Sequence, residues 1–91
     1  MSYTETNKKD VCNMIDSYTA DTLDEYIRLS AKKVATDSME YGHEPIKVAD
    51  SVFDFLNNGF SGNVVMAATC KQICPKNILL VLRNDIINKL K

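Results

Sequence analysis

The stretch Ile73-Cys-Pro75-Lys76-Asn-Ile-Leu-Leu-Val-Leu-Arg83-Asn84-Asp85 is the most informative part of this chain. A proline is well tolerated in the first turn of a helix, because the N–H that it lacks would have no partner within the helix. Apolar residues then recur with helical spacing, at Ile78, Leu79, Leu82, Ile86 and Leu90,. Lysines near the end of the segment suit the negative end of a helix dipole,. The pattern predicts an amphipathic helix over residues 75–91.

Three earlier segments carry the same helical period. Residues 45–58 open at a proline and have so wide an apolar face that we expect them to be buried against more than one neighbour,. Residues 22–37 begin with Thr22-Leu-Asp-Glu25, which fits a capping box,. Residues 7–18 have a narrow apolar stripe made of Val11, Met14, Ile15 and Tyr18. The fold class predicted from these segments is all-α.

The stretch Asn57-Asn-Gly59-Phe60-Ser61-Gly62-Asn63 leaves the middle of the chain open to two interpretations. A glycine inside a helix costs about 1 kcal/mol relative to alanine. Asn-Gly is also a good helix end and serine a good helix start, which favours two helices, 45–58 and 61–72. Tertiary packing can override these preferences, because glycine lets a crossing helix approach closely. The sequence is compatible with one long helix or with a break.

The amino-acid composition limits the range of possible functions. The 91 residues suit one small domain,. The formal net charge is −1, with residues 1–25 net acidic and residues 70–91 net basic, whereas a bulk DNA-packing protein is strongly basic,. The three cysteines cannot all pair with one another, and the polar N-terminus has no signal-peptide pattern, so we expect a reducing intracellular compartment,. No apolar run approaches the ~20 residues of a membrane span.

No group of residues in the sequence supports catalysis or metal binding. Cys70 and Cys74 are spaced i, i+4 but have no further ligand nearby, and His43 is far from them in sequence. The acidic residues at 21, 24 and 25 are explained by the start of a helix, where the dipole favours negative charge,. We therefore expect a protein that is not an enzyme, without catalytic residues, metal, cofactor or small-molecule substrate.

Three segments in order resemble the core-histone family. Tyr26-Ile-Arg28-Leu29 is similar to the start of a histone first helix, and Val52-Phe-Asp54-Phe-Leu56 is similar to a run in the long central helix. The stretch from Ile73 to Asp85 resembles the second loop and third helix, and it is the most specific of the three. The resemblance implies a histone fold (helix, loop, long central helix, loop, helix) over residues 21–91. Residues 1–20 would then be an N-terminal extension with a short amphipathic helix.

The same resemblance implies partners and contact residues. A histone-fold chain pairs with another histone-fold chain, here a heterodimer more readily than a homodimer, through Val52, Phe53, Phe55, Leu56, Phe60, Leu79 and Leu82. The positions that match DNA contacts in the family are Arg28, Lys71 and Lys76,. The positions that match a protein-docking surface are Asp54, Asp85, Ile86 and Ile87. Because the first loop, residues 36–44, has no lysine or arginine, any DNA binding is expected to be weak,.

Two functions therefore follow from the sequence. One is a histone-fold dimerisation subunit of a chromatin-like or transcription-related complex, in the nucleus, or in the host nucleus or virus particle if the protein is viral. The other is a compact four- or five-helix bundle that acts as a small protein-binding adaptor or regulator, as a monomer or a homodimer, through an exposed apolar groove. The high Asn, Lys and Ile content suggests an AT-rich genome, which suits a viral adaptor.

Overall fold

The computed structural model describes residues 2–58 and 75–91, and within these ranges the chain is all-helical. The helices are α1 (Glu5–Thr19), α2 (Glu25–Glu40), α3 (Pro45–Asn58) and α5 (Lys76–Leu90). The all-α prediction is confirmed. The residues beyond Asn58, on which the choice between a long and a broken helix depended, lie outside the described ranges.

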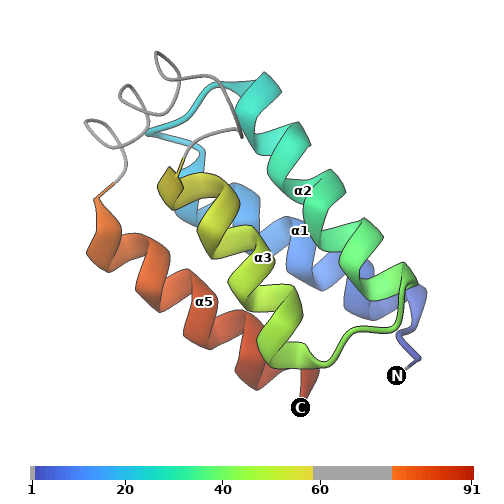
Figure 1. Ribbon diagram of the computed structural model, residues 1–91. Helices are drawn as coiled ribbons and strands as arrows, with labels where there is room; N and C mark the ends of the chain where they lie inside the picture. The colour runs from blue at the N-terminus through green and yellow to red at the C-terminus, as the bar shows by residue number, and fades with distance from the viewer. Residues whose placement is uncertain (1, 59–74) are drawn as a thin grey trace.

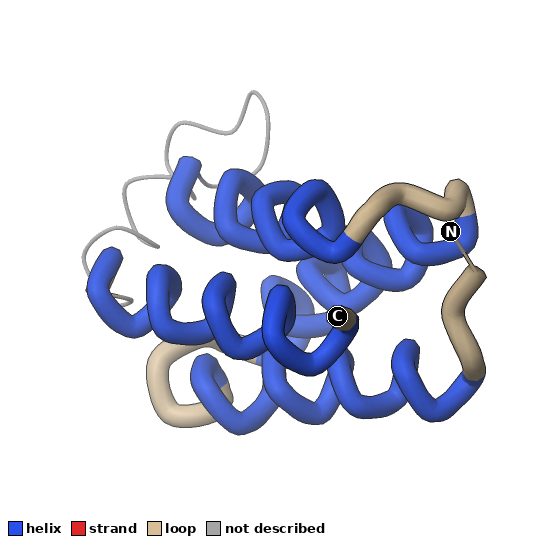
Figure 2. Tube along the Cα trace, turned by 90° about the horizontal axis from the view of Figure 1, so that it is seen from below, coloured by secondary structure: helices blue, strands red, loops and turns tan. Residues whose placement is uncertain are grey.

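The helices form a closed bundle in which neighbours run in opposite directions (Figure 1). Helix α1 packs against α2 and α5, and α3 also packs against α2 and α5, so each helix has two extensive neighbours. Seen from below, the helices lie alongside one another and loops join their ends (Figure 2). Both described ends of the chain lie at the same end of the bundle (Figure 1).

The core receives side chains from all four of these helices. Val11 and Ile15 of α1 are fully buried, as are Val48 and Ala49 of α3. The other apolar residues at or below 2% exposure are Ile27, Ala31, Ala35, Met39, Val52, Leu56, Leu79, Leu82 and Ile86. In the structure α1 is part of the bundle, where it packs against α2 and α5.

The helix starts differ in how they are capped. Thr4 and Asn7 form a capping box at α1: the Thr4 hydroxyl accepts the Asn7 N–H at 3.0 Å, and the Asn7 side-chain oxygen accepts the Thr4 N–H at 3.0 Å,. At α5, Pro75 occupies the cap position and makes no side-chain bond to the first turn.

The capping box predicted at Thr22 is wrong, because α2 begins three residues later. Its N-cap is Asp24, whose carboxylate accepts the Ile27 N–H at 2.9 Å. The backbone N–H groups of Thr22 and Leu23 instead donate to the carbonyl of Thr19, and Leu23 is buried. This turn at the end of α1 uses the residues that would otherwise have started α2.

Candidate functional site

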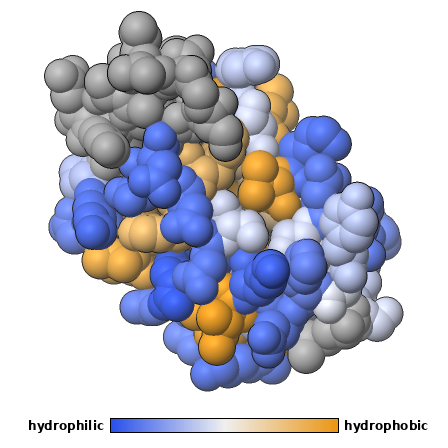
Figure 3. Space-filling view, viewed as in Figure 1, coloured by the Kyte–Doolittle hydropathy of each residue, from blue (hydrophilic) through white to orange (hydrophobic). Residues whose placement is uncertain are grey.

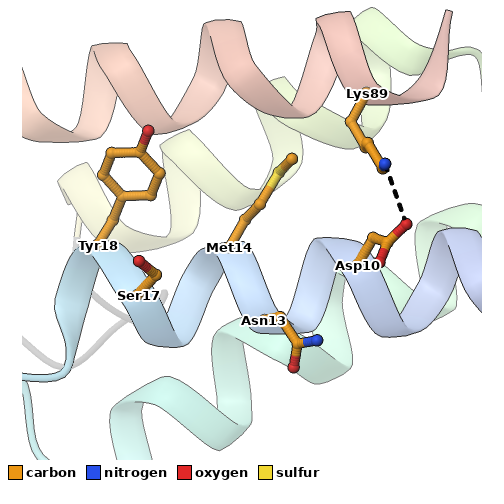
Figure 4. A pocket seen from close by; sticks show the side chains of 6 residues that line it. All are labelled: Asp10, Asn13, Met14, Ser17, Tyr18 and Lys89. Atoms are coloured by element: carbon orange, nitrogen blue, oxygen red, sulfur yellow. Dashed lines mark ion pairs between the residues drawn. The ribbon is translucent and has the colours of Figure 1, made fainter.

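The main candidate site is a shallow groove between α1 and α5, with a volume of about 310 Å³. Its lining residues are Asp10, Asn13, Met14, Ser17, Tyr18 and Lys89. Five of the six come from one side of α1, because positions three and four apart share a helix face. Figure 4 shows Met14 and Tyr18 reaching from α1 towards α5, with Lys89 above Asp10.

The groove has polar ends and an apolar middle. At one end Lys89 Nζ lies 3.3 Å from Asp10 Oδ2 (Figure 4). At the other end the Tyr18 hydroxyl donates a hydrogen bond to the carboxylate of Asp85. Met14 lies between them, partly buried and packed against the core. These contacts join α1 to α5 and leave an apolar depression between an ion pair and a hydrogen-bonded pair.

The electrostatics of the groove centre on Asp85. The hydrogen bond to the Asp85 carboxylate raises the pKa of the Tyr18 hydroxyl above its ordinary value, with smaller contributions from burial and from the negative charge of Asp85,. Within the described ranges no lysine, arginine or histidine forms an ion pair with Asp85. Asp85 does not itself line the groove. Through Tyr18 it places a carboxylate beside one end of the groove, with no cation paired to it among the described residues.

Arg28, predicted to contact DNA, is engaged within the protein. Its guanidinium lies 3.2 Å from Asp16 Oδ1 and also donates to the carbonyl of Leu23. Lys32 approaches the other Asp16 oxygen at 2.8 Å. The hydrogen bond from Lys32 is the largest of the effects that lower the pKa of Asp16, followed by smaller contributions from Arg28,. In the structure this cluster connects α1 to α2.

The other predicted DNA contacts are not brought together with Arg28. Lys76 is exposed at the start of α5, which packs against α1 and α3, whereas Arg28 lies on α2. Lys71 lies outside the described residues. DNA binding through these three residues stays a prediction.

The residues predicted for a dimer interface mostly lie inside the single chain. Val52, Leu56, Leu79 and Leu82 are each 1–2% exposed and form part of the core, while Phe53 and Phe55 are half-buried against it. Phe60 lies outside the described residues. The chain's own helices thus supply the burial that was expected from a partner.

The predicted protein-docking residues separate into two groups. Ile86 and Ile87 are buried, because α5 turns Leu79, Leu82, Ile86 and Leu90 towards the core as one helical stripe,. Asp54 is exposed on α3, and Asp85 lies beside one end of the α1–α5 groove. On the face shown in Figure 3, apolar side chains form separate small areas among polar ones rather than one large patch.

Among residues 2–58 and 75–91, no three His, Cys, Asp or Glu side chains are grouped as a metal site would require. No helix in the same ranges combines the length and apolar character needed to cross a membrane. Comparisons with protein-family models, with curated proteins and with solved structures find no match to this chain.

Proposed function

We propose that this chain is a small helical protein-binding domain that folds around its own core and binds a partner segment in the α1–α5 groove. The observation that carries this proposal is the burial of Val52, Leu56, Leu79 and Leu82 by helices of the same chain. A domain that completes its own core is free to use its surface for recognition. This is the adaptor function rather than histone-type pairing.

The groove suits a segment that presents one apolar side chain beside a basic one. A volume of about 310 Å³ is at the lower limit of small-molecule pockets and has room for one or two side chains,. Methionine adapts its shape to different apolar partners, so Met14 suits the middle of such a groove. The Asp85 carboxylate, which has no cationic partner among the described residues, would accept the basic side chain,.

Selection from a random peptide library displayed on phage, with the full chain as bait, tests this groove. We expect the enriched peptides to combine a Leu, Phe or Met with a neighbouring Arg or Lys. The Asp85→Asn variant removes the charge and keeps an oxygen for the Tyr18 hydroxyl. It should weaken binding about three- to fivefold, the effect of an exposed ion pair worth up to ~1 kcal/mol.

The matched control is Asp54→Asn, which removes an exposed carboxylate from α3 and should leave binding unchanged. Enriched peptides without basic residues, or equal effects of the two variants, would overturn the role assigned to the groove.

Pairing with another histone-fold chain remains the competing proposal, supported by the sequence resemblance. It differs in what the isolated chain does, because a histone-fold chain obtains its core from its partner. Circular dichroism and urea unfolding of the purified full chain separate the two proposals. Cooperative unfolding of the chain alone supports the adaptor, and a disordered chain that folds only when a histone-fold partner is added contradicts it.

A further inference from the structure

The solvent-facing side of α5 carries no charge over most of its length. Between Lys76 and Lys89 the exposed residues of this helix are Asn77, Leu80, Val81, Asn84 and Asn88. We call these five residues the α5 outer face. Leu80 is 41% exposed and Val81 is 49% exposed, so this face presents two apolar side chains flanked by amides.

The two charged residues in this part of α5 are directed to its flanks. Arg83 Nε lies 2.5 Å from Asp50 Oδ1 of α3. On the opposite flank the Asp85 carboxylate accepts the Tyr18 hydroxyl of α1. Both charges are therefore used in contacts with neighbouring helices. The Arg83 guanidinium also donates to Asn84 Oδ1 at 3.3 Å, so the five residues of the α5 outer face are themselves uncharged, with a cation at the edge beside Asn84.

Helices α2 and α3 differ, because Lys33 and Asp54 are exposed charges in the interior of each. On α1 the exposed residues after Lys9 are uncharged too, Asn13 and Ser17, but no large apolar side chain is exposed beside them. Asparagine is also a poorer helix former than lysine or glutamate, so three asparagines on a solvated helix face carry a cost in stability. Depletion of charge with retained apolar groups is typical of the centre of a protein interface.

We propose that the α5 outer face pairs with the same face of a second copy of this chain, forming an antiparallel homodimer. A twofold interface uses one patch on both subunits, so the patch must be complementary to itself. An asparagine amide meets this condition because it both donates and accepts hydrogen bonds. A face without charge cannot repel its own copy, and the net charge of −1 on the whole chain adds little repulsion,.

The positions of the five residues define a register. A twofold axis that crosses α5 between Leu80 and Val81 places each of these side chains beside its equivalent in the second copy. Because Asn77 and Asn84 lie about two helical turns apart, the same axis puts Asn77 of one copy opposite Asn84 of the other. One helix face buries less than the roughly 800 Å² per partner of a standard interface. We therefore expect a weak dimer.

The α5 outer face is distinct from both the histone-type dimer residues and the α1–α5 groove. Leu79 and Leu82, which the histone resemblance placed at a dimer interface, stay in the core of each copy. The peptide groove lies on the α1 flank of α5 and does not include the five residues of the α5 outer face. The inference therefore does not rest on the proposed function, and peptide binding by a monomeric variant tests the groove separately.

Sedimentation equilibrium of the full chain over a roughly hundredfold concentration range tests the dimer. The Leu80→Lys variant places a charge beside its own copy and should weaken dimerisation by about tenfold or more, with an unchanged circular dichroism spectrum. The matched control is Leu29→Lys on α2, where the leucine is 52% exposed, and this variant should dimerise as the original chain does. A chain that is monomeric throughout, or equal effects of the two variants, would overturn the inference.

A charge exchange tests the antiparallel register. Asn84→Lys alone should weaken the dimer, because a lysine would replace one member of each amide pair. Combining it with Asn77→Glu puts opposite charges face to face twice across the twofold axis, so the N77E/N84K chain should recover its dimer affinity. Failure of the double variant to recover would contradict this register. Recovery, with the folded spectrum retained in every variant, supports it.

Discussion

At the scale of single residues, Ser38 is the polar side chain least accommodated by the fold. The residue lies near the end of α2 and is 6% exposed, and its hydroxyl oxygen has no hydrogen-bond partner within the described parts of the chain. A buried polar group without a partner costs about 1–3 kcal/mol. Burial here follows from the position of Ser38 one turn after Ala35 and beside Met39, on the side of α2 that faces the core,.

Replacing this serine should stabilise the protein. We expect Ser38→Ala to raise the free energy of unfolding in urea by about 1 kcal/mol or more. Ser30→Ala is the control, because its hydroxyl donates to the Tyr26 carbonyl at 3.0 Å and the gain in helix propensity is common to both variants,. Equal changes in the two variants would mean that the Ser38 hydroxyl is satisfied.

At the scale of elements, Asp16 makes the contact between α1 and α2 depend on pH. Its pKa is lowered in the folded protein, chiefly by the hydrogen bond from Lys32. A carboxyl with a lowered folded pKa stabilises the protein above its unfolded pKa, and this contribution is lost as the pH falls through the folded value. Its side chain is 36% exposed, so solvent screening limits the contribution to about 0.5–1 kcal/mol,.

Asp16→Asn should accordingly lower the free energy of unfolding near neutral pH. The difference from the original chain should shrink in acid, at pH values well below the ordinary carboxyl pKa of 3.8. Urea unfolding at several pH values measures both effects. Asp21→Asn, at an exposed carboxylate with no ion pair in the described ranges, is the control and should show no such dependence. A deficit for Asp16→Asn that is the same at all pH values would contradict the assignment.

The elements also show what the sequence could predict. The apolar stripes predicted the bounds of the helices to within a few residues, because helical periodicity is a local property of the sequence. Residues 45–58 match α3, and residues 75–91 contain α5. The neighbours of each helix could not be predicted in this way. The apolar stripe that includes Leu79 and Leu82 looks the same whether it faces a partner or the chain's own α1 and α3.

The candidate site could be predicted only in part for the same reason. Met14 and Tyr18 belonged to the predicted stripe of the first helix, and Asp85 was noted as a docking position. Their meeting depends on α1 packing against α5, a contact between residues 67 positions apart for Tyr18 and Asp85. No local pattern records such a contact, so the groove could not be recognised from the sequence alone.

At the scale of the whole molecule, α1 completes the bundle. Val11 and Ile15 are fully buried against the other helices, and fully burying such a side chain is worth about 1.5–3 kcal/mol,. The stability of a small domain is only about 5–15 kcal/mol in total. Loss of α1 would also expose the sides of α2 and α5 that it covers.

A chain that consists of residues 21–91 should therefore not fold cooperatively, and thermal melts followed by circular dichroism should show no sharp transition. Addition of a peptide with residues 1–20 should restore part of the helical signal, which controls for simple loss of solubility. A sharp transition in the shortened chain would instead favour the separate histone-type domain expected over residues 21–91.

The N-terminal turns of α1 and α5 should open at different rates. The first turn of α1 is closed by the Thr4–Asn7 capping box. Helix α5 starts at Lys76, at the positive end of its dipole, and its N-cap Pro75 makes no side-chain bond to the first turn,. Local opening of a helix end needs little free energy when few bonds hold it, so amide hydrogens at the start of α5 exchange with solvent long before those of α1. The opening turn includes Asn77, so association of two copies would also slow hydrogen exchange at that end of the helix.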